Sequence, residues 1–165
     1  MTDFVTKYAN SAAITIGLAS LASTTADPPA GRESTEVDNS SDKFLGVHLD
    51  GKITTGTSPT NGKRICLWGY AVAFDGTNYR RPSGITGADG NRTPSIGFKT
   101  AMRLLHSIDT DNTSNKEYAF TGIEFPFAFM PIRWGIFVHH DTAVALNATA
   151  GNQEIRYTGF KMTTV

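Results

Sequence analysis

The sequence is poor in several kinds of residue, and each shortage excludes a class of protein. A single cysteine, Cys66, in 165 residues excludes an intramolecular disulfide framework and a multi-cysteine zinc site. No apolar run reaches the ~20 residues that a membrane helix needs. The best candidate, residues 12–22, is too short and is interrupted by Thr15, Gly17 and Ser20. We therefore expect neither a disulfide-stapled fold nor a membrane partner.

Charge is also scarce, and it is balanced. Lys plus Arg and Asp plus Glu are 15 each, so the formal net charge is zero, and only 18% of residues are charged. Roughly 25% is typical of globular domains. Proteins that bind nucleic acid by neutralising phosphates carry an excess of basic residues, often in one block. The sequence has neither, and it predicts no nucleic-acid partner.

Turn and strand residues are abundant, and helix formers are few. The chain has 22 Thr, 16 Gly, 11 Ser, 10 Asp, 9 Asn and 7 Pro, but only 8 Leu and 5 Glu. Gly, Pro, Asn and Asp favour turns, and Thr favours strands. Because 39% of residues are hydrophobic, a real core is still expected. The composition predicts an all-β protein without a helix.

Alternating apolar and polar residues locate the strands of this protein. The pattern predicts strands over residues 14–18, 32–39, 44–53, 64–74, 102–108, 117–123, 133–139 and 154–164. About eight or nine strands in one domain over residues 13–165 indicate an antiparallel two-sheet β-sandwich, most simply jelly-roll-like. Residues 1–12 are expected to form an N-terminal arm or the lead-in to the first strand.

One segment, residues 75–100, has no periodicity and is expected to be a long irregular loop. It contains five glycines and two prolines, and its length suggests a functional excursion. Tyr79, Arg80, Arg81 and Arg92 lie in it. The arginines could bind carboxylates of a neighbouring chain, because guanidinium forks match carboxylate geometry. A merely solvated loop is the alternative.

Three aromatic residues alternate in a second unusual segment. Phe125, Phe127 and Phe129 lie between Pro126 and Pro131, so an extended chain would point the three rings the same way. They could cap the core of the sandwich. Alternatively they could contact a partner subunit, since aromatic residues are enriched at interfaces.

The sequence contains no motif of nucleophilic, zinc or dinucleotide chemistry. Residues 56–63 resemble a phosphate loop, but the glycine spacing is wrong and a strand follows, so we expect a hairpin turn. His139, His140 and Asp141 are consecutive, and neighbours on a strand point to opposite faces. We interpret them as a strand end. The alternating acids of residues 109–117 indicate a solvated turn rather than a calcium loop. The sequence thus predicts no enzyme, no cofactor and no metal site.

Parts of the chain resemble a known group of proteins. The segments are residues 31–63, residues 133–152 and residues 13–21, with the motifs RESTEVDN, GKITTGTSPT and RWGIFVHHDTAVAL. Together they resemble stretches of structural proteins from the particles of tailed bacteriophages. One position departs from the pattern, since Ala143 stands where the group has glycine.

The resemblance implies a small jelly-roll-like decoration or cement protein on the phage capsid. Its partners would be the major capsid protein and other copies of itself, most simply in a homotrimer. It would be made in the bacterial cytoplasm and located on the virion. Two alternatives remain open: a tail, neck or adaptor component, and a glycan-binding β-sandwich displayed on the particle. In the second, Trp68, Trp134, Tyr70 and Tyr79 would stack on sugars.

Overall fold

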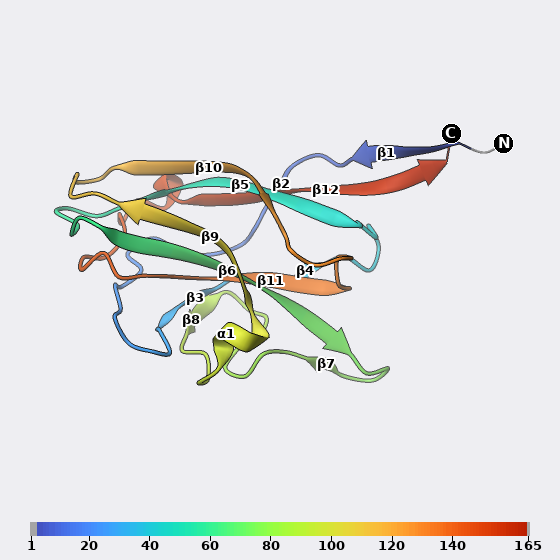
Figure 1. The fold of residues 1–165 in the computed structure, drawn as a ribbon, viewed down its shortest axis with the longest axis horizontal. Coiled ribbons are helices and arrows are strands. Elements are labelled where there is room, and N and C mark those ends of the chain that lie inside the picture. Colours follow the sequence, from blue (N-terminus) through green and yellow to red (C-terminus); the bar gives the residue numbers. More distant parts are fainter. Residues whose placement is uncertain (1–2, 165) are drawn as a thin grey trace.

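The chain, seen here as a computed structural model that describes residues 3–164, is built almost entirely from strands (Figure 1). The strands are β1 (Phe4–Tyr8), β2 (Ala12–Ala13), β3 (Gly31–Glu33), β4 (Val37–Asp38), β5 (Gly46–Thr54), β6 (Lys63–Phe74), β7 (Tyr79–Arg80), β8 (Gly90–Arg92), β9 (Arg103–Thr110), β10 (Glu117–Glu124), β11 (Arg133–His140) and β12 (Glu154–Thr164). These twelve exceed the predicted eight or nine because several strands have only two or three residues. A four-residue helix, α1 (Phe98–Ala101), and a 3-10 turn, η1 (Ala150–Asn152), also depart from the helix-free prediction.

The strands form two antiparallel, curled sheets. The first sheet has the order β1-β12-β5-β10, with β2 beside β12. The second sheet has the order β7-β6-β11-β3-β8, with β4 beside β11 and β9 beside β6. Strand β6 lies between β11 and β9, in the interior position that its long apolar run predicts. The all-β, two-sheet prediction is therefore confirmed, and the jelly-roll assignment stays a prediction.

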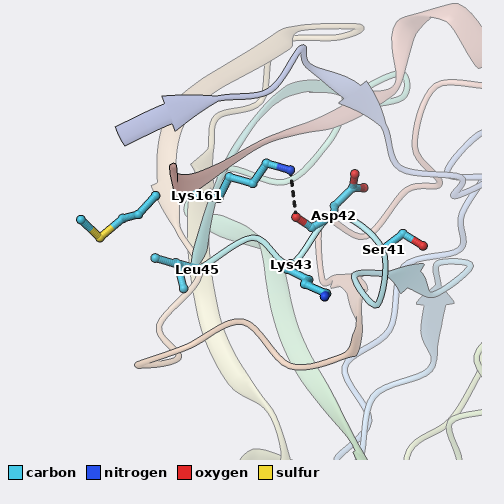
Figure 2. Close-up of a pocket in the computed structure, with 6 residues that line it drawn as sticks. Ser41, Asp42, Lys43, Leu45 and Lys161 are labelled. Atoms are coloured by element: carbon cyan, nitrogen blue, oxygen red, sulfur yellow. Dashed lines mark hydrogen bonds between the residues drawn. The ribbon is translucent and has the colours of Figure 1, made fainter. Parts of the chain in front are cut away.

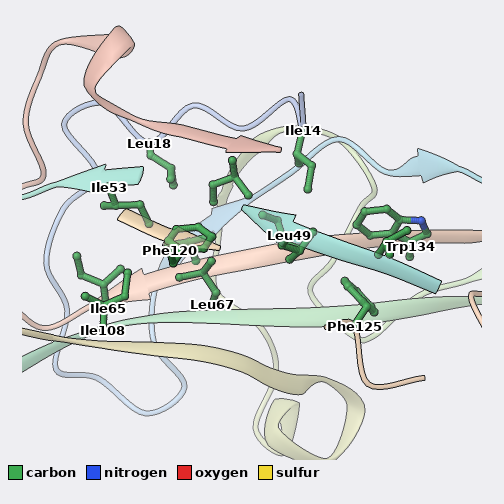
Figure 3. Packing of buried hydrophobic residues seen from close by; sticks show 14 of the residues in the cluster. Ile14, Leu18, Leu49, Ile53, Ile65, Leu67, Ile108, Phe120, Phe125 and Trp134 are labelled. Carbon is green, nitrogen blue, oxygen red and sulfur yellow. The ribbon is translucent and has the colours of Figure 1, made fainter. Parts of the chain in front are cut away.

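The main core lies between the two sheets (Figure 3). Leu49 and Ile53 of β5 face Ile65 and Leu67 of β6, and all four side chains are fully buried. Trp134 of β11 is also fully buried, and its ring lies edge-on to Phe125 with centroids 4.9 Å apart. Burial of side chains of this size contributes about 1.5–3 kcal/mol each. This core holds the two sheets together.

A second core covers the outer face of the second sheet. Tyr70 and Phe137, on the outer faces of β6 and β11, are fully buried beneath residues of the 81–102 segment. Phe98 of α1 packs edge-on against Trp68 at 5.0 Å. The segment predicted to be a loop is thus a cover with β7, β8 and α1 in it. Cys66, on the same outer face, is half-buried, and this burial raises the pKa of its thiol.

The predicted strand over residues 14–18 is wrong, because this extended segment crosses between the sheets. The Ile14 N–H donates to the Ile155 carbonyl of β12 at 2.9 Å. The Thr15 carbonyl instead accepts from the Thr35 N–H, also at 2.9 Å. The alternation of buried and exposed side chains survives, but no continuous ladder forms, and only β2 precedes it.

The predicted strand over residues 32–39 is two short strands, β3 and β4, separated by residues 34–36. The Ser34 N–H donates to the Ile136 carbonyl at 3.0 Å, and its hydroxyl accepts from the Ile136 N–H at 3.0 Å. The side chain thereby takes a place in the ladder that the backbone would otherwise hold. Strand β3 lies between β11 and β8, so it is not an edge strand.

The hairpin predicted at residues 56–63 is also wrong. Strand β5 before it belongs to the first sheet and β6 after it to the second, so the segment arches from sheet to sheet. It runs beside the turn at residues 111–116, with the Asn115 N–H donating to the Gly56 carbonyl at 2.9 Å. Turn-forming residues signal a reversal of the chain, but they do not say which strand is paired next.

The departure from the phage pattern at Ala143 coincides with an unfavourable backbone conformation. Ala143 has φ of 68°, in the left-handed region, where a non-glycine residue costs roughly 1–2 kcal/mol. Its side chain is exposed. We expect Ala143→Gly to raise the free energy of unfolding by about 0.5–1 kcal/mol. The gain is smaller than the full conformational cost because glycine also has more entropy in the unfolded chain. Urea denaturation measures this, and a loss of stability would contradict it.

Candidate interaction surface

The histidines at the end of β11 point to opposite faces, as predicted. His140 is fully buried in the main core, with Nε2 donating to the Leu21 carbonyl at 2.9 Å and Nδ1 2.9 Å from the Thr142 hydroxyl. His139 lies on the outer face and stacks on Trp68. Over residues 3–164, no three His, Cys, Asp or Glu side chains come together in a way that could hold a metal ion.

His139 gives the protein a specific acid sensitivity. Burial, with a smaller effect of His140, lowers the pKa of His139 to about 4. Between pH 6.5 and about 4 the unfolded chain binds a proton that folded His139 does not, so stability falls as the pH falls. We expect a loss of about 2–3 kcal/mol from this group across that range, since one pKa unit corresponds to about 1.4 kcal/mol. Melting curves at several pH values should be less steep in pH for His139→Gln than for the natural chain; equal slopes would contradict this.

The alternating acids of residues 109–117 bind cations of the chain itself. Asp111 pairs with Lys116 and accepts from the Thr113 N–H at 2.9 Å, and these bonds lower the pKa of its carboxyl. Asp109 pairs with Arg64 at 3.1 Å. The segment after β9 is a polar turn, as predicted.

The arginines of the 75–100 segment hold that segment onto the sheet. Glu33 of β3 is fully buried, and its carboxylate accepts from Arg92 Nε at 3.1 Å and from the Tyr70 hydroxyl at 3.1 Å. The N–H groups of Thr86 and Gly87 donate to the same carboxylate. Burial, and next the charge of Glu33, raises the pKa of Tyr70. One buried carboxylate therefore anchors the middle of the segment.

The other predicted residues of this segment also have partners within the chain. Arg81 binds Glu36 with two bonds of 2.6 and 2.9 Å, and this pairing raises the pKa of Arg81. The exposed Arg80 is 3.0 Å from Asp75. The ring of Tyr79 lies under the Arg133 guanidinium, 4.0 Å from it. A contact of this segment with a neighbouring chain stays a prediction.

The three phenylalanines after β10 do not point the same way. Phe125 is buried in the main core, and Phe127 packs on it with ring centroids 5.1 Å apart. Phe129 is 75% exposed. The segment is not a strand, so the alternation that predicted a shared direction does not apply. Of the three, Phe129 is the residue a partner could reach.

A two-stranded ribbon projects from the first sheet beside Phe129. Strand β1 pairs with the last five residues of β12, from Phe4 opposite Thr164 to Tyr8 opposite Phe160. Strand β5 reaches β12 only as far as Gly46 opposite Phe160, so the ribbon beyond that point has no further strand beside it. Figure 1 shows both ends of the described chain at its tip. All five residues of β1 are exposed.

Exposed apolar side chains gather at the base and along the face of this ribbon. Seven of the ten large exposed hydrophobic residues of the described chain are here: Phe4, Val5, Tyr8, Leu45, Phe129, Ile132 and Met162. Leu45 borders three surface hollows, one with Met162, one with Phe160 and one with Phe129 and Ile132. We call Leu45, Phe129, Ile132, Met162 and the ribbon the apolar end. Sequence reasoning missed it, apart from Phe129.

No known protein family matches the chain, and no curated protein matches it either. Among the helices of the described chain, none has the length and apolar character needed to cross a membrane.

Proposed function

We propose that this protein is a structural component of a tailed-phage particle, most simply a decoration or cement protein on the capsid. The observation that carries the proposal is the apolar end: exposed apolar groups gathered in one region mark protein interaction sites more often than single ones do. The resemblance of residues 31–63 and 133–152 to phage particle proteins supports the particle as the place of that interaction. The proposed role is binding, not catalysis.

In this proposal the protein acts by reinforcing the capsid through non-covalent contacts. Each copy would place its apolar end on the major capsid protein, while the paired sheets act as a rigid body. A two-stranded ribbon alone is marginally stable in water, so contact with the shell would also order β1 and the end of β12. Many weak contacts, made by copies that also touch one another in trimers, would hold the shell by multivalency. The zero net charge keeps repulsion between crowded copies small.

Most of the rings that the glycan-binding alternative needs are covered by other side chains. Trp134 and Tyr70 are fully buried and offer no face to a sugar, and Trp68 is half-buried with Phe98 packed edge-on against it. Tyr79 is covered by Arg133. The tail, neck or adaptor alternative keeps the same contacts and differs in the number of copies per particle.

The proposal is tested on particles from which the protein has been stripped. We expect such particles to lose resistance to heat or pressure while the geometry of the capsid is unchanged, and to regain resistance when purified protein is added back. Stripped particles as robust as complete ones would contradict the cement role.

A further inference from the structure

The ribbon carries an unfavourable pair of like charges. Lys7 of β1 is directly opposite Lys161 of β12 in the antiparallel register. Like charges at directly opposed positions destabilise a strand pair. The two lysines share a face of the ribbon, whereas Tyr8, Phe160 and Met162 lie on the other.

These lysines stand out because most of the chain's charge is neutralised. Eleven ion pairs join side chains of the described residues. Within the same residues, four cations lack a carboxylate within 4.0 Å, and three of them, Lys7, Lys43 and Lys161, are at the ribbon. The fourth, Arg103, begins β9 in the other sheet.

Lys43 and Lys161 border the same hollow, which opens between the ribbon and residues 41–45 (Figure 2). Its volume is about 430 Å³, and Leu45 and Met162 complete the wall. Lys161 Nζ donates to the backbone carbonyl of Asp42 at 3.2 Å, and the Asp42 side chain is the one carboxylate in the lining. Positive charge therefore exceeds negative charge in this hollow, beside two exposed aliphatic side chains.

The carboxylate of Asp3, which immediately precedes β1, is too far from Lys7 and Lys161 to offset the pair. Asp3 is four positions before Lys7, a span of about 13 Å in an extended chain. Charges further apart than about 8 Å are largely screened at physiological salt.

We propose that this hollow binds an acidic segment of the partner protein, with carboxylates against Lys43 and Lys161 and an apolar side chain against Leu45, while Met162, on the other face of β12, borders the rim of the hollow. The inference rests on the proposed function and specifies which chemical groups of the capsid protein would contact this chain. A second copy meeting the same face would bring lysines together, so it is not the occupant. A phosphate backbone could also pair with the lysines, but it would leave the exposed Leu45 without an apolar partner.

The test uses the full chain and two synthetic peptides that differ only in charge. The acidic peptide is acetyl-DELFED-amide, and its matched control, acetyl-NQLFQN-amide, replaces each carboxylate by an amide. Binding is followed by backbone amide shifts in NMR titrations. We expect the acidic peptide to shift residues 41–45 and 161–162 and to bind at least tenfold more tightly than the amide peptide. Raising salt from 50 to 300 mM should weaken it several-fold.

Charge-reversal variants identify the lysines responsible. Lys43→Glu with Lys161→Glu should weaken acidic-peptide binding at least tenfold, whereas Arg103→Glu, the matched control, should change it less than twofold. Equal binding of both peptides, an equal loss in the control, or tighter binding of single-stranded DNA or polyphosphate would overturn the inference.

The inference and the proposed function fail in different ways. Peptide binding at the hollow by a chain that is absent from phage particles would leave the inference standing and reject the function. Particles that take up the double lysine variant as fully as the natural chain would keep the function and reject the acidic contact.

Discussion

Replacing Glu33 by alanine is expected to lower the free energy of unfolding by about 3–5 kcal/mol, as the loss of one partner in a buried, charged network does. The Glu33 carboxylate is fully buried and accepts from Arg92, Tyr70, Thr86 and Gly87. Alanine would leave these donors unpaired and one guanidinium without its counter-ion, and would release the segment they anchor.

Two further variants separate this network from a general loss of charge. Glu33→Gln should cost less, because its amide keeps one acceptor oxygen but turns an NH₂ toward the donors. Glu124→Ala removes an exposed carboxylate and should change stability by less than about 0.5 kcal/mol. Urea denaturation measures all three. A cost below about 1 kcal/mol for Glu33→Ala would mean that the carboxylate does not hold the segment.

Replacing Phe98 by alanine should cost about 3–5 kcal/mol, as is usual for a buried phenylalanine. Phe98 is 4% exposed and joins the short helix α1 to the outer face of β6 through Trp68. Its loss would open the second core to water. Trp68 should then fluoresce at longer wavelength, a change seen most clearly with Trp134→Phe as background so that one tryptophan reports.

Ile96→Ala is the matched control for Phe98→Ala, since Ile96 lies in the same segment and is 91% exposed. It should leave both the stability and the emission of Trp68 unchanged. If Phe98→Ala behaved like this control, residues 81–102 would be a dispensable loop rather than a cover.

The sequence predicted the long strands well because their alternation reports burial directly. Strands β5, β6, β9, β10, β11 and β12 lie within a few residues of their predicted positions. Of the short strands, β3 and β4 were predicted as one strand and the others were missed, since two or three residues are too few to show a period. Residues 14–18 do show a period and were predicted as a strand, but an extended segment that crosses between the sheets also buries alternate side chains without pairing as a strand.

The partners of each segment could not be predicted from local pattern. For Arg81 and Arg92 the sequence left open a contact with another chain or a solvated loop, and within the chain they bind Glu36 and Glu33, more than 40 residues away. Leu45 and Met162 belong to alternating strand patterns like any core residue. Leu45 is exposed because it lies just before β5 at the end of the first sheet. Met162 is exposed because it lies on the outer face of β12, beyond the last residue that β5 pairs.

The central claim is that this chain is a structural protein of a phage particle and attaches there through its apolar end. Quantitative mass spectrometry of purified particles of the phage that encodes it tests this most directly. We expect hundreds of copies per particle for the natural chain and far fewer for a Leu45→Asp, Met162→Asp variant that still folds. Absence of the natural chain from the particles, or equal copy numbers for the two, would contradict it.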